Sequence, residues 1–368
     1  MSNRLRRRKS REWLIRKSRR IQGLQNGKSF KQKKRLEKFL IHNSSSRQSL
    51  RVYPDNSIEI HLPSTLDFDA NYTTTVSHLL LLRSAVAYGI KIRRLAFERL
   101  EKMSTSAALA LASEIDQWNQ KRRRLRAALH TWHPNIYKIF TQMGFFELLG
   151  LPKQETMQSV DGATFLPFRR GVVSKTDDGG AQARLFRQEI EAITGVEVAQ
   201  LELFAALSEA MTNVGQHAYD NMGARVKKQW WLSASFNHKT RLLKVTFLDH
   251  GRTIPKTLPL KWDNFEKIKD IFNTMSDAAK IKAAVTMGRS RTRQAHRGKG
   301  LRDLMTFAMA YPQGSLAIFS RKGKYWVRPA NDVPPNFDPT QPLTVVEEKL
   351  LENRLSIGGT LIEWAVTI

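Results

Sequence analysis

Strand-type and helix-type patterns alternate along this chain from about residue 50, and this alternation restricts the fold more than any other feature. The segment SLRVYPDNSIEIHLPSTLDF predicts short strands and a turn, and TTTVSHLLLLRSAVAYGI predicts a helix with a broad apolar face. IRRLAFERL predicts a strand, and KMSTSAALALASEIDQW predicts a helix capped by hydroxyl side chains. HPNIYKIFTQMGFFELLG predicts one more helix, which ends near Gly150. Strands that alternate with helices indicate an α/β domain over residues 49–152.

The first 48 residues carry more than half of the excess positive charge. The whole sequence has 61 Lys and Arg against 33 Asp and Glu, a net charge of +28. Residues 1–48 hold 17 of these cations and two acids, Glu12 and Glu37, which gives +15. We interpret this segment as a basic arm, flexible or helical, suited to contacts with nucleic-acid phosphates. A solvated tail without a partner is the alternative.

The composition also excludes several classes of protein. Cys is absent, so nothing supports a disulfide scaffold. No apolar run reaches the roughly 18 residues of a membrane span. The nearest candidate, HLLLLRSAVAYGI, is interrupted by Arg83. The basic N-terminus is not followed by the apolar stretch of a secretory signal. We therefore expect a cytoplasmic protein without a membrane partner.

The second half begins after a stretch rich in polar residues, Gly and Pro. This stretch, residues 153–184, indicates a connection between domains. Beyond it, LFRQEIEAITG and VEVAQLELFAALSEAMTNVGQHAYD predict helices, and WWLSASF and LLKVTFLDHG predict strands joined by a polar turn. A basic loop leads to GKGLRDLMTFAMAYP, where a Gly pair precedes a helix. GSLAIFS and KYWVRP predict a hairpin, and GGTLIEWAVTI a final strand.

Short motifs in this half carry groups suited to nucleotide binding. Glu209, Asn213 and His217 recur at four-residue intervals, so they lie roughly along one helix face. An Asn can supply a hard oxygen to Mg²⁺ beside phosphates, and a carboxylate one turn earlier can act as a general base. Asp249, at a strand end, can accept a hydrogen bond from an exocyclic amine. Glycines before a helix let backbone N–H groups approach phosphates.

In this order the motifs resemble those of the GHKL ATPase family, which includes gyrase-type topoisomerases, heat-shock chaperones, histidine kinases and MutL proteins. The resemblance covers residues 185–368 and implies a two-layer α/β sandwich with a mixed β-sheet that binds ATP and Mg²⁺. It implies that Glu209 is the catalytic carboxylate of the N-box and that Asn213 coordinates Mg²⁺. The further nucleotide-binding positions that it implies are Asp249, Gly251, Gly298, Lys299, Gly300, Leu301 and Thr360. Thr253 stands where the family usually has a second glycine, which implies a stiffer or reshaped loop.

Residues 49–152 resemble a STAS domain, the fold of anti-sigma factor antagonists. The segment MSTSAAL occupies the place of the phosphorylated motif of that family and puts Thr105 at the acceptor position. Ser104 and Ala107 replace the acidic residue and the glycine of the family motif. Helix capping is the competing interpretation of these hydroxyl residues.

The two resemblances imply a Mg-ATP-binding regulatory protein that acts as a nucleotide-dependent switch. An ATPase and an anti-sigma-type Ser/Thr kinase are the enzyme classes that fit. The partners implied are ATP, a protein bound through the STAS-like domain, and a second copy of the chain in a homodimer. One alternative is a nucleic-acid-associated GHKL ATPase that holds DNA or RNA with residues 1–48. A second alternative is an ATP-binding scaffold without turnover.

Overall fold

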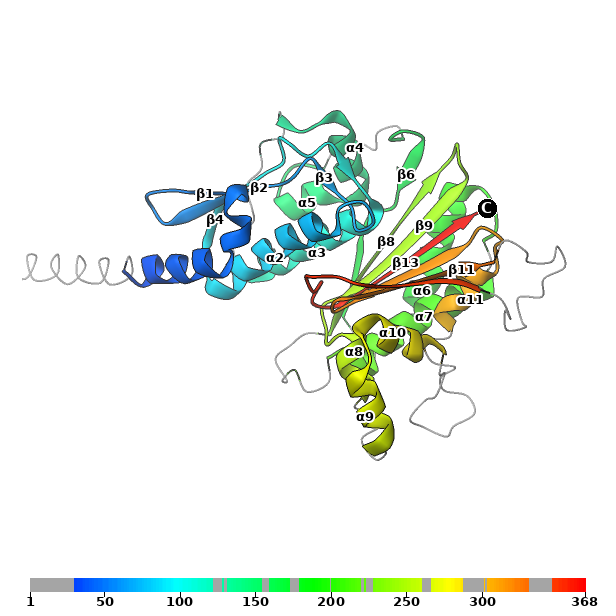
Figure 1. Ribbon diagram of the computed structural model, residues 1–368. Coiled ribbons are helices and arrows are strands. Elements are labelled where there is room, and N and C mark those ends of the chain that lie inside the picture. The colour runs from blue at the N-terminus through cyan, green and yellow to red at the C-terminus, as the bar shows by residue number, and fades with distance from the viewer. Residues whose placement is uncertain are drawn as a thin grey trace, which may run out of the picture.

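A large C-terminal β-sheet forms the centre of the molecule, and an N-terminal layer of helices and small sheets covers one of its faces (Figure 1). The computed structural model describes residues 30–121, 128, 131–153, 159–172, 179–198, 200–219, 222, 228–259, 266–286, 301, 303–330 and 346–368. The fold is therefore mixed α/β, as the sequence predicts. Most of the basic arm, residues 1–29, lies outside the described residues. Its remaining part contains a helix over residues 30–42.

The N-terminal layer is built from a three-stranded sheet of order β1-β2-β4 and a parallel pair, β3-β5. β2 runs antiparallel to β1 and parallel to β4, and the chain reaches β4 through helix α2. Gly89, with φ +66°, ends α2 in the left-handed conformation. The bounds are β1 Leu50–Val52, β2 Ser57–His61, β3 Thr65–Leu66, α2 Tyr72–Tyr88, β4 Lys91–Ala96, β5 Lys102–Met103 and α3 Thr105–Lys121.

Two helices stand where the sequence predicts a single one. They are α4, Pro134–Met143, and α5, Phe145–Leu149. Gly144 separates them with φ +86°, a conformation that ends a helix and that glycine adopts without strain. The apolar pattern continues across this break because both helices bury their residues in the same core, where Phe140 and Phe145 stack with ring centroids 3.9 Å apart.

The C-terminal sheet has the order β12-β11-β10-β13-β9-β8-β6, with β7 also paired to β8. Every strand pair described in it is antiparallel, so the expected mixed sheet is wrong. β9 and β10 do run in the same direction, but β13 lies between them and is antiparallel to both. The bounds are β6 Ala163–Phe165, β7 Arg169–Val172, β8 Gln229–Asn237, β9 Leu242–Asp249, β10 Ser315–Ser320, β11 Gly323–Pro329, β12 Val346–Glu352 and β13 Thr360–Thr367.

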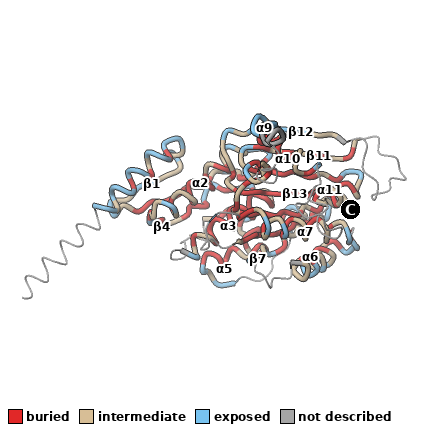
Figure 2. The backbone as a smooth tube through the Cα atoms, turned by 90° about the horizontal axis from the view of Figure 1, so that it is seen from below, coloured by how far each residue is buried: buried red, intermediate tan, exposed pale blue. Residues whose placement is uncertain are grey.

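Helices cover both faces of this sheet, which adds a third layer to the two expected. Helices α6 (Gly179–Thr194), α7 (Gln200–Asn213) and α11 (Asp303–Met309) bury one face, and α3 of the N-terminal layer packs on the other. Along β8, Trp230 faces the α7 side and Trp231 faces the α3 side. Because both faces are covered, β8 is buried from Gln229 to Phe236, and buried residues run through the middle of the molecule (Figure 2).

Several elements occupy segments that the sequence assigns to connections. β6 and β7 lie within residues 153–184 and extend the sheet at its edge. Helices α8 (Ile254–Thr257), α9 (Glu266–Thr274) and α10 (Asp277–Thr286) occupy the first part of the expected basic loop. Among the helices described, none is both long and apolar enough to cross a lipid bilayer.

Candidate functional site

The ends of two neighbouring strands bring together residues far apart in the sequence. β9 ends at Asp249, β13 begins at Thr360, and these two residues are directly paired in the sheet. The hydroxyl groups of Thr360 and Ser320 are 3.0 Å apart, and the Ser320 hydroxyl accepts a hydrogen bond from the N–H of Ile254 at 2.9 Å. This corner of the sheet is therefore a fixed frame for the polar groups of Asp249 and Thr360.

Asp249 is a buried carboxyl group that accepts a hydrogen bond from the loop after β9. It is 5% exposed, and its Oδ1 accepts a hydrogen bond from the N–H of Gly251 at 2.7 Å. Burial raises the pKa of this carboxyl from 3.8 to about 7, although the hydrogen bond from Gly251 acts in the opposite direction. A second donor, such as an exocyclic amine, would stabilise the ionised form.

The loop after β9 packs tightly against Ala218, at the end of the turn that follows helix α7. A Cβ on Gly251 would lie 2.3 Å from the carbonyl oxygen of Ala218, so only glycine fits at this position. The N–H of Arg252 donates a hydrogen bond to the same carbonyl oxygen. Thr253 has an extended backbone and precedes α8, so the position of the second family glycine begins a short helix here. Its buried hydroxyl has no hydrogen-bond partner among the described residues.

Helix α7 places Asn213 and Glu209 in direct contact. The Nδ2 of Asn213 donates to the Glu209 carbonyl oxygen at 3.0 Å and to its Oε1 at 2.8 Å. The amide nitrogen is thereby turned toward Glu209, and Oδ1 is the atom of Asn213 that can serve a hard cation such as Mg²⁺. Glu209 is therefore in position both to orient Asn213 and to polarise a hydroxyl or water beside it.

The helix does not continue regularly through His217. A π-helical turn, Val214–Ala218, follows Asn213, so His217 is displaced from the regular i+4 position that the sequence predicts. His217 nevertheless lines the same cavity as Asn213. π-Helical turns are frequent at functional sites, because they shift the residues that follow them relative to one helix face.

These elements surround one pocket, which is partly open to solvent. The polar groups that line it are Asn213, His217, Asp249, Arg252, Thr257 and Thr360, and the apolar lining consists of Ala210, Ala218, Phe247, Ile254, Leu258, Ala284, Leu301 and Ile362. A mostly apolar wall with a few convergent polar groups is typical of a ligand site.

The structure thus brings together most of the expected site residues. Asn213, Asp249, Leu301 and Thr360 line the pocket, Glu209 contacts Asn213, and Gly251 forms the adjoining loop. The expected phosphate-binding residues Gly298, Lys299 and Gly300 lie outside the described residues.

Sequence reasoning missed the pocket residues that α8 and α10 contribute. These are Ile254, Thr257, Leu258 and Ala284. The Thr-Ile-Pro sequence at residues 253–255, a helix start with an early proline, is the signal that could have identified α8.

Thr105, which the sequence resemblance assigns to the phospho-acceptor position, lies away from this pocket. It is 4% exposed, and its hydroxyl is 2.6 Å from that of Ser235, between α3 and β8. Ser235 faces the N-terminal layer, whereas the pocket lies on the opposite face of the sheet. Ser104 caps α3, since its hydroxyl accepts a hydrogen bond from the N–H of Ala107 at 3.4 Å. The folded chain therefore gives the pocket no access to its own Thr105.

Comparison with protein-family models, with curated proteins and with solved structures gives no match. Among the residues described, no cluster of three or more His, Asp or Glu side chains is arranged to hold a metal ion. A cation at this site would therefore be held by Asn213 together with the groups of a ligand.

Proposed function

We propose that this chain binds Mg·ATP and acts as a nucleotide-dependent regulatory switch of the GHKL type. One observation carries the proposal: Asn213, Asp249, Leu301 and Thr360, from four separate segments, line a single pocket. The residues present also fit the ligand. Asp249 offers a buried acceptor for an amine, and the Oδ1 of Asn213 offers a hard oxygen.

Different side chains contact the adenine end and the phosphate end of the nucleotide. Asp249 accepts a hydrogen bond from the adenine amine while Thr360 supports it from the neighbouring strand, and Phe247 and Ile362 give the base an apolar surface. Asn213 orients the cation, and Glu209 keeps Asn213 in place. Bound Mg²⁺ would neutralise phosphate charge.

Calorimetry of Mg·ATP binding tests the proposal directly. We expect Asn213→Ala to weaken binding at least tenfold, because it removes the cation ligand. Gln216→Ala, which removes an exposed amide from the adjoining turn, should leave affinity unchanged. Wild-type protein that binds no Mg·ATP would refute the proposal.

Measuring phosphate release in the same samples distinguishes an enzyme that hydrolyses ATP from a scaffold that only binds it. Glu209→Gln keeps an oxygen that can accept the hydrogen bond from Asn213 but removes the base. If the wild type releases phosphate, and this variant binds Mg·ATP but releases none, the protein is an ATPase. Binding without turnover in the wild type indicates the scaffold.

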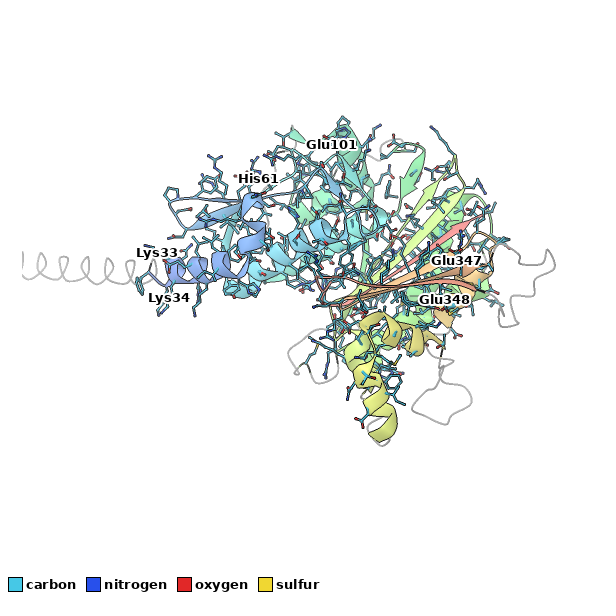
Figure 3. The ribbon with its side chains drawn as sticks, in the orientation of Figure 1. Lys33, Lys34, His61, Glu101, Glu347 and Glu348 are labelled. Carbon is cyan, nitrogen blue, oxygen red and sulfur yellow. The ribbon has the colours of Figure 1, made fainter. Side chains whose placement is uncertain are left out.

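A nucleic-acid-associated ATPase is the second candidate, and the helix over residues 30–42 favours it. This helix exposes five cations and a single acid: Lys31, Lys33, Lys34, Arg35 and Lys38, with Glu37. Lys33 and Lys34 extend from the helix at the end of the molecule distant from the C-terminal sheet (Figure 3). Such a surface suits a polyanion, whose binding is driven by counterion release.

Salt-dependent binding of a labelled oligonucleotide tests this candidate. Deleting all of residues 1–48 would remove Leu36 and Phe39, which are buried in the N-terminal core, so truncation should stop before residue 30. Lys33→Gln combined with Lys34→Gln should reduce the slope of log affinity against log salt by about 1–2. An unchanged slope would show that this helix does not contact phosphates.

A further inference from the structure

One arginine of the N-terminal layer contacts the C-terminal sheet at the corner where Asp249 and Thr360 lie. We propose that Arg83, on helix α2, is a positioning residue that holds Asp249 and Thr360 in register for nucleotide binding. The inference rests on the function proposed above and extends it: the N-terminal layer becomes part of the nucleotide site although it lines none of the pocket.

One set of hydrogen bonds joins Arg83 to the segment that leads into β13. The Nη1 of Arg83 donates hydrogen bonds to the carbonyl oxygens of Ile357 at 2.8 Å and Gly358 at 3.1 Å. Thr360, the first residue of β13, follows two positions later. These bonds fix the point from which the chain enters the strand.

A second set of hydrogen bonds joins Arg83 to His250, the residue after Asp249, and to Glu114. The Nη2 of Arg83 donates to the Nδ1 of His250 at 2.9 Å and also bonds Glu114, while its Nε donates to Glu114 Oε1 at 3.1 Å. Glu114, on α3, is itself buried. All five N–H hydrogens of the guanidinium therefore have acceptors, which only the fork of an arginine can achieve.

The hydrogen bonds around His250 form a directed chain. The Ser113 hydroxyl donates to the carbonyl oxygen of Ala110 at 2.7 Å, so it accepts from the Nε2 of His250, 2.9 Å away. Nδ1 must then be the unprotonated nitrogen that accepts from Arg83, and the ring is neutral. The Trp231 ring meets it edge-on with centroids 4.9 Å apart. The His250 ring is thus held at both of its nitrogens and against Trp231.

The backbone is shaped to admit the arginine. Gly358 has φ +67°, and a Cβ built on it would lie 2.1 Å from the Nη1 of Arg83. Any other residue would therefore suffer both backbone strain and a clash with the guanidinium. Gly359 meets the carbonyl oxygen of Asp249 just as closely, with a Cβ distance of 2.1 Å. Two successive glycines let the segment before β13 fit between the arginine and the end of β9.

The arrangement explains how docking of the N-terminal layer can set nucleotide affinity. Asp249 and Thr360 face each other across β9 and β13, and Arg83 ties together the segments that flank them. Without it, the segment before β13 and the residue after β9 lose their common partner. The affected contacts lie on the adenine side, so ATP and ADP should lose affinity equally.

Calorimetry with Mg·ATP and Mg·ADP on Arg83→Ala, Arg83→Lys and Arg170→Ala tests the inference. Arg170→Ala is the matched control, because it removes another arginine that pairs across the layers, with Asp116 at 2.9 Å, without touching either strand end. We expect about tenfold weaker binding of both nucleotides by Arg83→Ala, partial recovery in Arg83→Lys, and wild-type affinity for Arg170→Ala. Without nucleotide, the rate of amide hydrogen exchange at residues 249–251 and 357–360 should rise in Arg83→Ala and in neither of the other variants.

The outcomes separate the two proposals. If the wild type binds neither nucleotide, the proposed function fails and the inference fails with it. If the wild type binds but Arg83→Ala binds equally well, or Arg170→Ala is weakened as much, only the inference fails. Should Arg83→Ala not fold, Ser113→Ala provides the second variant, since it removes only the hydroxyl that accepts from His250. It should weaken both nucleotides two- to threefold, and unchanged affinity would overturn the inference.

Discussion

Replacing Asp249 by Asn is expected to stabilise the folded protein at neutral pH, although Asp249 lines the candidate site. Burial raises the pKa of this carboxyl to about 7 from 3.8. Between these values the unfolded chain has released the proton and the folded chain retains it. The free energy of unfolding therefore falls as pH rises through this window and becomes level above about pH 7.

The magnitude follows from the size of the shift. About three pH units at about 1.36 kcal/mol per unit give about 4 kcal/mol of destabilisation at pH 8 relative to a neutral side chain. At pH 5 the same reasoning gives a smaller destabilisation, about 2 kcal/mol. An Asn at position 249 cannot ionise, and its Oδ1 can still accept the hydrogen bond from Gly251. The variant should therefore gain stability, and the gain should grow with pH.

Urea unfolding at several pH values between about 5 and 8, followed by Trp fluorescence, measures this difference. The control is Asp270→Asn, which removes one acid from an exposed position on α9. A pH-independent difference between Asp249→Asn and the wild type, or a variant that is less stable at pH 8, would refute the reasoning.

Three further results are expected. ATP affinity should rise up to tenfold per pH unit below about pH 7 and level off above it, because in the proposed complex the adenine amine binds the ionised Asp249. Calorimetry in two buffers would detect the released proton, and an affinity that does not change with pH would contradict this. Thr105→Glu should lower the free energy of unfolding by at least about 3 kcal/mol in urea, because it buries an unpaired charge, whereas Thr105→Val should cost less than half as much; equal losses would contradict burial as the cause. Gly251→Ala should weaken ATP binding at least tenfold, because the new Cβ would displace the loop from Ala218, and unchanged affinity in calorimetry would show that the loop does not hold the nucleotide.

The sequence predicts elements well where local pattern and burial agree. β8 and β9 are apolar with a polar turn between them, and they appear as predicted. β12, with the sequence VEEKLLE, was missed because it is an outer strand of the sheet, where charged residues such as Glu347 and Glu348 obscure any alternation (Figure 3). β6 and β7 are short and lie at the opposite edge, so polar and glycine residues again conceal them.

The composition of the site was more predictable than its geometry. The resemblance to GHKL motifs selected Asp249 and Thr360, but their pairing depends on β13 entering the sheet between β9 and β10. That insertion joins segments more than 100 residues apart, and no local pattern specifies it. Arg83 had a local signal, because it is the one charge in an otherwise apolar stretch of α2. Its partners, Gly358 and His250, are too distant in sequence to be inferred from it.

Burial of β8 on both faces has a consequence for how the chain is made. The face of α3 that packs on the sheet is synthesised first, and more than 100 residues separate the end of α3 from the start of β8. At about 5–20 residues per second, a ribosome needs roughly 5–20 s to reach the start of β8, and longer to complete the sheet. Throughout that interval the nascent N-terminal layer exposes apolar surface that only the later sheet can cover, so its folding is completed from the C-terminal side.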